Sequence, residues 1–350
     1  MAARHLAVAY ITNPVSIAYL TGFFAEPIER LMGLAVRHDG ATLIVPALEE
    51  QNALEHATSV EITAWRDGED AYSLVARAIA GSAEIAVEKQ HLSLFAAEVL
   101  TSRSGASELV DIGPELQQLR LTKRADEIEK LARAAEITDA ATKEVMARIR
   151  EGQSEVEIAL MLGSLIGEAG GALSFETLVQ SGPNSALPHA RPSNRRLQAG
   201  DLVLLDFGAA YNGYKADTTR MAVVGEPAAR HRDIHSIVLD AHDAAIAAVR
   251  PGVTTGEVDA AARRVIEAAG YGERFFHRIG HGLGLEVHEA PSLDPESGTV
   301  LEAGMVFTVE PGIYIPGWGG VRIEDDVVVE ENGCRVLTKA DRALHGIASR

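Results

Sequence analysis

The segment Leu197-Gln-Ala-Gly-Asp-Leu-Val-Leu-Leu-Asp-Phe-Gly208 decides the fold of this chain, because a closely similar segment occurs about 100 residues later. The second copy is Leu301-Glu-Ala-Gly-Met-Val-Phe-Thr-Val-Glu-Pro-Gly312. Each copy begins with a glycine-containing turn, continues as an apolar run typical of a buried strand, and carries an acid at its end, Asp206 or Glu310. We therefore expect two related halves that each present one carboxylate at the end of a buried strand.

The repeat also includes the segments that precede these strands. Arg150-Glu-Gly-Gln-Ser-Glu-Val156 recurs as Arg250-Pro-Gly-Val-Thr-Thr-Gly-Glu-Val258, and each copy is followed by an amphipathic run that ends at Gly170 or Gly270. A period of this length is too long for a solenoid, whose repeats span roughly 20–50 residues. The sequence instead predicts two α/β halves packed together, with a functional site between them.

The residues before the repeat follow a different pattern. Short strand-like runs alternate with amphipathic stretches up to about residue 120, and a long helical pattern then begins at Leu121–Lys123, where Thr122 is suited to cap it. A chain of 350 residues has the length of two domains. We expect a smaller N-terminal α/β domain over residues 1–122 and a larger second domain over residues 123–350.

Composition excludes several classes of function. The chain has 32 Lys and Arg against 50 Asp and Glu, a formal net charge of −18, so it lacks the basic surface that nucleic acids and anionic membranes require. Its one cysteine, Cys334, allows no intramolecular disulfide and no multi-cysteine metal site. Neither a signal peptide nor an uncharged run of about 18 residues is present. We expect a cytoplasmic protein that binds neither nucleic acid nor membrane.

Two acids in the first half are placed to share a cation. Asp206 ends the apolar strand, Asn212-Gly213 predicts a type I′ hairpin turn, and Asp217 follows the turn. A two-residue turn here places Asp206 opposite Thr219 and makes Asp217 its diagonal neighbour on the same sheet face. Two ionised carboxylates at roughly 7–8 Å repel each other unless a cation lies between them.

The second half repeats this arrangement. Glu310 ends the apolar strand and Glu324 follows in Val321-Arg-Ile-Glu-Asp-Asp-Val327. Strand alternation places Arg322 on the same face as Glu324, which leaves open a plain ion pair within the strand.

Histidines complete the candidate site. The glycine-rich segment from His277 to His288 contains three imidazoles, with His281 between them, and His189 is a fourth candidate. Carboxylates with one or two imidazoles and no thiolate suit Mn²⁺, Co²⁺ or Zn²⁺, especially as a pair of ions that shares bridging carboxylates. No nucleophile elbow, phosphate loop or H-E-x-x-H helix competes with this interpretation. The residues therefore favour metal-assisted hydrolysis.

Together these motifs resemble the pita-bread-fold metallopeptidases, the family that includes aminopeptidase P, prolidase and methionine aminopeptidase. The set that carries the resemblance is Asp-Phe-Gly at 206–208, Asp-Thr-Thr-Arg at 217–220, Gly-His-Gly-Leu-Gly-Leu-Glu-Val-His-Glu at 280–289, Val-Glu-Pro-Gly at 309–312 and Arg-Ile-Glu-Asp at 322–325. The resemblance implies an α/β (α+β) fold. A creatinase-like N-terminal α/β domain would precede a pseudo-twofold pita-bread catalytic domain.

The resemblance also implies a metal centre. It calls for two divalent ions, with Mn²⁺ preferred and Co²⁺ or Zn²⁺ as alternatives. The implied ligands are Asp206, Asp217, His281, Glu310 and Glu324. In such enzymes the equivalents of Asp217 and Glu324 bridge the two ions, and the equivalent of Glu310 also passes a proton from water to the leaving nitrogen.

Further roles follow from the same resemblance. His288 matches the histidine that steadies the tetrahedral intermediate, and His189 matches one that lines the substrate pocket, so both join Glu310 as expected catalytic residues. The expected substrate-binding residues are His189, His277, His288, Tyr314 and Arg322.

The implied function is dinuclear-metal-dependent hydrolysis of Xaa-Pro bonds in small peptides with proline at the second position, by a homodimer. An Xaa-Pro dipeptidase, or prolidase, is favoured over an aminopeptidase P that takes longer peptides. Prolidases commonly hold the dipeptide carboxylate with an arginine just after the second histidine motif, where this chain has Glu289-Ala-Pro-Ser292. Arg322 or Arg37 would then have to supply the charge.

Two observations bear on the alternatives. Aminopeptidases P often carry a tryptophan directly after the first metal histidine, where this chain has Gly282. A non-catalytic peptide-binding module of the same fold is a third alternative, and it is disfavoured because all five ligand positions are occupied.

Overall fold

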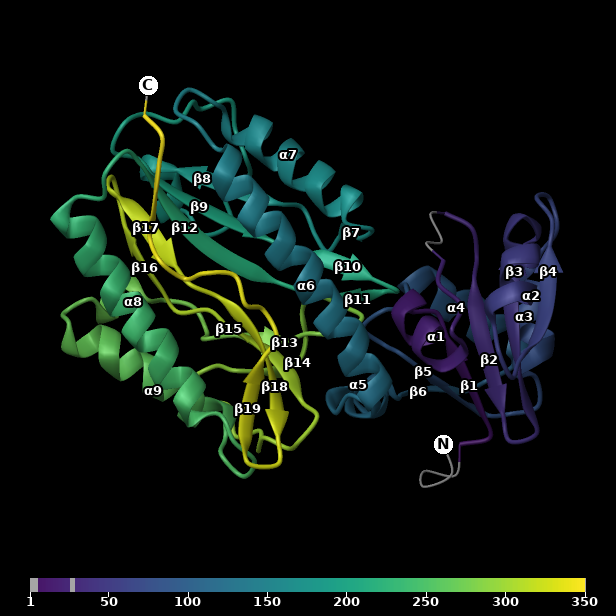
Figure 1. Ribbon diagram of the computed structural model, residues 1–350. Helices are drawn as coiled ribbons and strands as arrows, with labels where there is room; N and C mark the ends of the chain where they lie inside the picture. The colour runs from purple at the N-terminus through teal and green to yellow at the C-terminus, as the bar shows by residue number, and fades with distance from the viewer. Residues whose placement is uncertain (1–5, 26–28, 350) are drawn as a thin grey trace. The chain divides into compact units, whose positions relative to one another are not determined.

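The chain forms two compact units in the computed structural model, which describes residues 6–25 and 29–349 (Figure 1). The first unit is Met1–Leu119 and the second is Arg120–Arg350, so the division falls within helix α5 (Gly113–Leu121). The expected mixture of helices and strands in both units is confirmed.

The N-terminal unit is built on one six-stranded sheet with strand order β4-β3-β2-β1-β5-β6. The strands are β1 (Val8–Ile11), β2 (Gly33–Arg37), β3 (Gly40–Pro46), β4 (Glu61–Trp65), β5 (Glu84–Val87) and β6 (Glu108–Asp111). The other helices of this unit are α1 (Pro14–Thr21), η2 (Ala47–Glu49), α2 (Glu50–His56), α3 (Ala71–Ile79) and α4 (Leu94–Ser104). Two separate buried apolar clusters account for its core.

The first half of the catalytic unit contains a four-stranded sheet of order β20-β12-β9-β8 and a small sheet of order β11-β10-β7. Its elements are α6 (Ala125–Arg148), α7 (Glu155–Glu168), β7 (Ala172–Leu173), β8 (Leu178–Ser181), η3 (Gly182–Ala186), β9 (Leu202–Phe207), β10 (Ala209–Tyr211), β11 (Tyr214–Lys215) and β12 (Thr218–Val224). Strand β20 (His345–Ile347) comes from the end of the chain. Helices α6 and α7 pack on this sheet through a shared apolar cluster.

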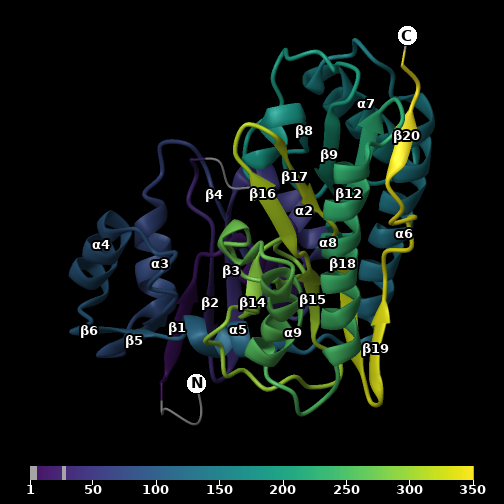
Figure 2. The same ribbon diagram turned by 90° about the vertical axis from the view of Figure 1, so that its left-hand side faces the viewer.

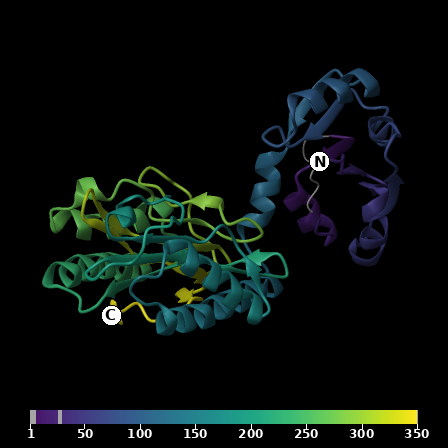
Figure 3. The same cartoon turned by 90° about the horizontal axis from the view of Figure 1, so that it is seen from above.

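The second half contains a five-stranded sheet of order β14-β13-β15-β18-β19 and the hairpin β16-β17. Its elements are α8 (Ala229–Ala248), α9 (Thr255–Ala268), η4 (Gly272–Arg274), β13 (His281–Gly282), β14 (Glu289–Ser292), β15 (Val306–Val309), β16 (Gly312–Ile315), β17 (Gly319–Arg322), β18 (Asp325–Glu330) and β19 (Gly333–Val336). Helices α8 and α9 run side by side (Figures 1 and 2). In this unit the helices lie along the periphery and the strands in the interior (Figure 3).

The internal repeat appears in the structure as a pair of equivalent helices. Ser154 caps α7 and Thr254 caps α9, and in each case a glutamate three residues later completes the capping box. Both helices end just before a glycine with positive φ, Gly170 or Gly270. The 100-residue offset seen in the sequence therefore corresponds to two locally equivalent helix–strand units.

The two halves meet through their strands. The last residue before β18, Glu324, forms an isolated antiparallel bridge with Thr219 of β12. The sheet of the first half is thereby joined to the sheet of the second half at the residues that the repeat predicts to carry the site.

One local expectation was wrong. The N-cap position of helix α6 is Arg124, not Thr122, and the Glu127 carboxylate accepts a hydrogen bond from the backbone N–H of Arg124 at 2.8 Å. Thr122 instead forms an isolated antiparallel bridge with Met305, and this pairing holds its backbone outside the helix. Among the described residues no helix combines the length and the apolar character that crossing a membrane requires.

Candidate metal centre

The hairpin of the first half has the register that its sequence predicts. Asp206 of β9 pairs with Thr219 of β12, and Asn212 and Gly213 both have positive φ, 48° and 83°, as a type I′ turn requires. Gly208 lets the two arms approach closely, because a Cβ at this position would lie 1.7 Å from the carbonyl oxygen of Ala216. The close approach brings the adjacent Asp217 towards Asp206.

A second glycine positions the histidine. A Cβ on Gly280 would lie 1.9 Å from the carbonyl oxygen of Thr308, so only glycine allows β13 to pack this closely on β15. The Thr308 hydroxyl also accepts a hydrogen bond from the backbone N–H of His281, at 3.1 Å. His281 is thus fixed against the strand whose following residue is Glu310.

Three of the predicted ligands form one compact group. Asp217, His281 and Glu324 each offer a ligand atom within 4.8 Å of the others, and their exposed fractions are only 4%, 3% and 1%. Glu310 adjoins them, with its Oε1 3.5 Å from His281 Nε2. Asp206 lies at the edge of the group and pairs with Arg322.

The electrostatics of this group call for a cation. Burial raises the pKa of Asp217 and Glu324 well above the usual range, and repulsion between neighbouring carboxylates raises both further. Asp217 Oδ1 is buried without a hydrogen-bond partner in the described part of the chain. An orphaned, buried carboxylate oxygen among like charges fits the donor set of a divalent ion.

The histidine in the group is suited to the same task. Burial and then the neighbouring His288 lower the pKa of His281 to about 3, so the ring is neutral. Its Nδ1 lies 3.2 Å from the carbonyl oxygen of Gly282. With the proton on Nδ1 donated there, the lone pair of Nε2 faces Asp217 and Glu310, as a metal-binding imidazole requires.

Arg322 is held entirely by protein groups. It is 3% exposed, pairs with Asp206, and donates hydrogen bonds to Thr219 Oγ1 at 2.9 Å and to Tyr314 Oη at 3.0 Å. Its contact with Glu324 is long, 3.9 Å from Nε to Oε2. Arg322 is therefore closer to Asp206 than to Glu324. A plain ion pair between Arg322 and Glu324 within the strand describes this arrangement poorly.

A cavity of about 820 Å³ opens beside these carboxylates. Every residue singled out from the sequence as a site residue lines it except Tyr314, which is buried beneath it. Tyr314 Oη lies 3.0 Å from His277 Nε2 and so links that histidine to Arg322. His288 packs edge-on against His281, with 4.1 Å between ring centroids, and the exposed His189 also lines the cavity.

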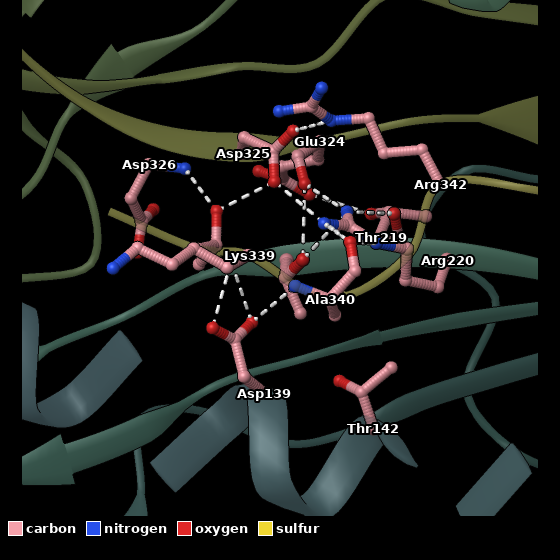
Figure 4. A network of polar contacts seen from close by, with 12 residues as sticks. Asp139, Thr142, Thr219, Arg220, Glu324, Asp325, Asp326, Lys339, Ala340 and Arg342 are labelled. Carbon is pink, nitrogen blue, oxygen red and sulfur yellow. Dashed lines mark hydrogen bonds and ion pairs between the residues drawn. The ribbon is translucent and has the colours of Figure 1, made fainter. Parts of the chain in front are cut away.

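A polar network behind Glu324 was not predicted from the sequence (Figure 4). The buried Arg220 donates hydrogen bonds to the Glu324 carbonyl oxygen and to Asp325 Oδ1, both at 2.6 Å. His242 Nε2 lies 3.0 Å from the other oxygen of Asp325, and Asp326 Oδ2 accepts the backbone N–H of Asp217 at 3.1 Å. These contacts hold the backbone carbonyl of Glu324 and the backbone N–H of Asp217, two of the candidate ligands.

A second unpredicted cluster holds the segment that carries His288. Arg120 Nη2 lies 2.5 Å from carboxylate oxygens of both Glu286 and Glu289, and Lys123 Nζ lies 2.7 Å from Glu289. Arg120, Lys123 and Glu289 are almost fully buried. Arg120, in the last turn of helix α5, and Lys123, just after that helix, therefore both bind Glu289, the residue that follows His288.

Comparison with known families finds two matches. The family model described as metallopeptidase family M24 matches residues 129–331. The model described as the creatinase/prolidase N-terminal domain matches residues 1–122.

Individual proteins resemble the chain over nearly its whole length. An uncharacterized peptidase of Staphylococcus aureus is 38% identical over 336 residues, which covers 95% of each chain. The structure of a prolidase from Pyrococcus furiosus is 38% identical with a TM-score of 0.91, covering 98% of this chain and 99% of that one. An X-Pro aminopeptidase structure from Thermotoga maritima is 34% identical with a TM-score of 0.89, covering 98% of each chain.

Proposed function

Because the chain belongs to metallopeptidase family M24 and is a peptidase, we propose that it hydrolyses the Xaa-Pro bond of dipeptides with the help of two divalent metal ions. The observation that carries this proposal is the buried group of Asp217, His281 and Glu324 beside a cavity large enough for a dipeptide. The likeness to a prolidase structure over both units supports the choice of substrate.

In this proposal the two ions, preferably Mn²⁺, are held by five side chains. These are Asp206, Asp217, His281, Glu310 and Glu324. When bound, the ions act as Lewis acids that polarise the scissile carbonyl and make water nucleophilic at neutral pH. Asp217 and Glu324 are the proposed bridging pair. Their carboxylates repel each other, and the ions would neutralise the negative charge that causes this repulsion.

Glu310 is the proposed general acid–base. Burial raises its pKa to about 7, and Arg322 moderates that rise. A carboxyl group in this range can both accept a proton from water and return it to a leaving nitrogen. Its Oε1 also lies 3.4 Å from the Thr308 hydroxyl, which orients it towards His281.

The histidines around the cavity are proposed to handle the substrate. His288 is neutral, because burial and then Arg278 lower its pKa, and it is proposed to donate a hydrogen bond to the oxyanion of the tetrahedral intermediate. His189 and His277 face the same cavity and are proposed to line the peptide. Tyr314 is proposed to act beneath them by fixing His277 and Arg322.

Specificity for proline has a physical basis in this cavity. The nitrogen of an Xaa-Pro bond carries no hydrogen, so an enzyme that grips the N–H of the scissile bond loses that contact. Activation of the carbonyl by metal ions needs no such grip. Apolar side chains of Phe175, Leu187 and Phe276 line the same cavity, and we propose that they receive the pyrrolidine ring.

The decisive experiment compares three peptides with enzyme supplied with Mn²⁺. We expect rapid hydrolysis of Ala-Pro, slow hydrolysis of Ala-Pro-Ala and little hydrolysis of the control Ala-Ala. Faster cleavage of Ala-Pro-Ala than of Ala-Pro would favour an aminopeptidase P instead. No cleavage of either proline peptide with Mn²⁺, Co²⁺ or Zn²⁺ would refute the proposal.

The proposed assembly is a homodimer, as the resemblance to the family implies. Light scattering of the full chain tests it, and a molar mass equal to that of one 37.3 kDa chain would contradict it.

A further inference from the structure

The guanidinium groups of Arg322 and Arg278 line the cavity, and they differ in how many of their N–H donors are already hydrogen-bonded to protein groups. Arg322 is buried and already bound to Asp206, Thr219 and Tyr314. Arg278 is only half-buried, and the hydrogen bond found for its side chain goes to Ser292 Oγ at 3.1 Å. No carboxylate among the described residues forms an ion pair with it. Arg278 is therefore the cation of this cavity that still has donors to offer.

The backbone that carries Arg278 is firmly held. The carbonyl oxygen of His277 accepts a hydrogen bond from Arg263 at 2.9 Å, and the N–H of Ile279 donates one to Asp259 at 3.1 Å. Arg263 and Asp259 pair with each other on helix α9. The residues on both sides of Arg278 are thus fixed to the same buried ion pair.

The guanidinium is also held in place. Ser292 is the last residue of β14 and pairs with His281 in the sheet register, so Arg278 reaches the strand pair that carries the candidate ligand. One hydrogen bond to Ser292 uses one of the five N–H donors of an arginine and leaves the others free. A partly buried guanidinium in this state is ready to bind an anion through charge-assisted hydrogen bonds.

The proposed substrate supplies an anion. In a dipeptide the terminal carboxylate follows directly after the proline ring, whereas a longer peptide has an uncharged amide there. We propose that Arg278, steadied by Ser292, binds the terminal carboxylate of the Xaa-Pro dipeptide and so selects dipeptides over longer peptides. This inference rests on the proposed function and adds the residue that sets the substrate length.

The two arginines that the sequence suggested for this role are both engaged by other groups. Arg37 belongs to the N-terminal unit and donates hydrogen bonds to the carbonyl oxygens of Ala78 and Ala80 within that unit, at 3.2 Å and 3.0 Å. Arg322, as described above, is engaged by its own neighbours. Arg278 therefore replaces both residues that the sequence suggested.

The test uses two substrates with the same scissile bond, Ala-Pro and its amide Ala-Pro-NH₂, which lacks the carboxylate. Arg278→Ala is expected to raise KM for Ala-Pro about ten- to hundredfold, because one charge-assisted hydrogen-bonding site is lost. KM for the amide is expected to change less than about threefold. Arg278→Lys is expected to restore part of the lost affinity, because it keeps the charge but not the planar fork. Arg274→Ala removes a nearby exposed arginine and serves as the matched control.

Metal content and thermal unfolding of each variant show whether the change is local. Equal losses on Ala-Pro and on its amide, or no loss on either, would overturn the role of Arg278 while leaving the proposed function intact. If Arg278→Ala does not fold, Ser292→Ala replaces it, with an expected rise of a few fold in KM for Ala-Pro alone.

A binding measurement separates this inference from the proposed function. If the wild-type enzyme cleaves neither substrate, the proposed function fails, and calorimetry with proline and prolinamide then tests Arg278 without turnover. Weaker binding of proline but not of prolinamide to Arg278→Ala would support the carboxylate site. An unchanged preference between the two would refute it.

Discussion

Asp217 combines two properties that conflict when no cation is present. Its carboxylate is buried beside Glu324 and Asp206, and one of its oxygens has no hydrogen-bond partner in the described residues. An acid whose pKa is higher in the folded state costs stability once the pH rises above its unfolded pKa of about 4. The cost grows as the pH rises from that value towards the folded pKa, so the metal-free protein is destabilised by this carboxylate at neutral pH.

Asp217→Asn is expected to have opposite effects on the two forms of the protein. Without metal the substitution removes one repelling charge and supplies an amide N–H to the neighbouring carboxylates, so the free energy of unfolding should rise. With Mn²⁺ the variant should gain no stability and should lack activity, because a proposed metal ligand is gone. Urea unfolding with and without EDTA, together with metal analysis, measures both effects.

The result that would contradict this account is a variant that still binds two ions or still turns over Ala-Pro. Thr338→Ser, a conservative change of a buried hydroxyl in the network behind Asp325, controls for general sensitivity of this region. It should change the free energy of unfolding of the metal-free protein and of the Mn²⁺-bound protein in the same direction.

Single residues were predictable from the sequence where they belong to a motif of known spacing. Asp206 and Asp217 could be paired because the turn Asn212-Gly213 fixes the register between them. Arg278 could not be singled out in this way. Its role depends on the contact with Ser292, fourteen positions away, and on the engagement of Arg322 by other groups.

At the scale of elements, capping was predictable only where it is local. Ser154 and Thr254 each have their glutamate partner three residues later, so the capping boxes of α7 and α9 are visible in the sequence. Thr122 looks equally suited to cap α6, but its backbone pairs with Met305, 183 positions away. A long-range strand contact thus decides where this helix begins.

The buried ion cluster around Glu289 leads to a prediction about an element, the β14 segment. Glu289 neutralises Arg120 and Lys123, and Gly284 makes room for it, since a Cβ there would lie 2.4 Å from Glu289 Oε1. Glu289→Ala should therefore leave the buried Lys123 without its ion-pair partner and Arg120 with Glu286 alone. We expect the free energy of unfolding to fall by about 3–5 kcal/mol. Urea unfolding measures this change.

Glu296→Ala is the matched control, because Glu296 lies a few residues further along and is exposed. It should change the free energy of unfolding by no more than about 0.5 kcal/mol. Similar small effects from both substitutions would show that the cluster contributes little to holding the segment that carries His288.

At the scale of the whole molecule, the duplicated sequence predicts the architecture better than any single motif does. Two similar strands ending in acids require two similar sheets, and the bridge between Thr219 and Glu324 is where these sheets join. The repeat explains why the proposed ligands come from both halves. It does not show which buried arginine neutralises which carboxylate, because Arg220 and Arg322 bind partners over 100 positions away.

The distribution of tryptophans allows the stability of the two units to be measured separately. The sequence has two, Trp65 in β4 of the N-terminal unit and Trp318 in the catalytic unit, where it packs with Arg230. Trp65→Phe leaves a fluorophore that reports on the catalytic unit alone. Trp318→Phe leaves one that reports on the N-terminal unit alone.

Removal of metal should act on the catalytic unit first. Ions that bind only the folded state add about 2.7 kcal/mol of stability at a free concentration of 100 times Kd, and EDTA removes this contribution. We expect EDTA to lower the unfolding midpoint seen by Trp318 more than that seen by Trp65, and added Mn²⁺ to restore it. The Asp217→Ala change, made in the same background, should abolish the Mn²⁺ response. A response of equal size in that variant would mean that the stabilising ions bind elsewhere than between the two halves.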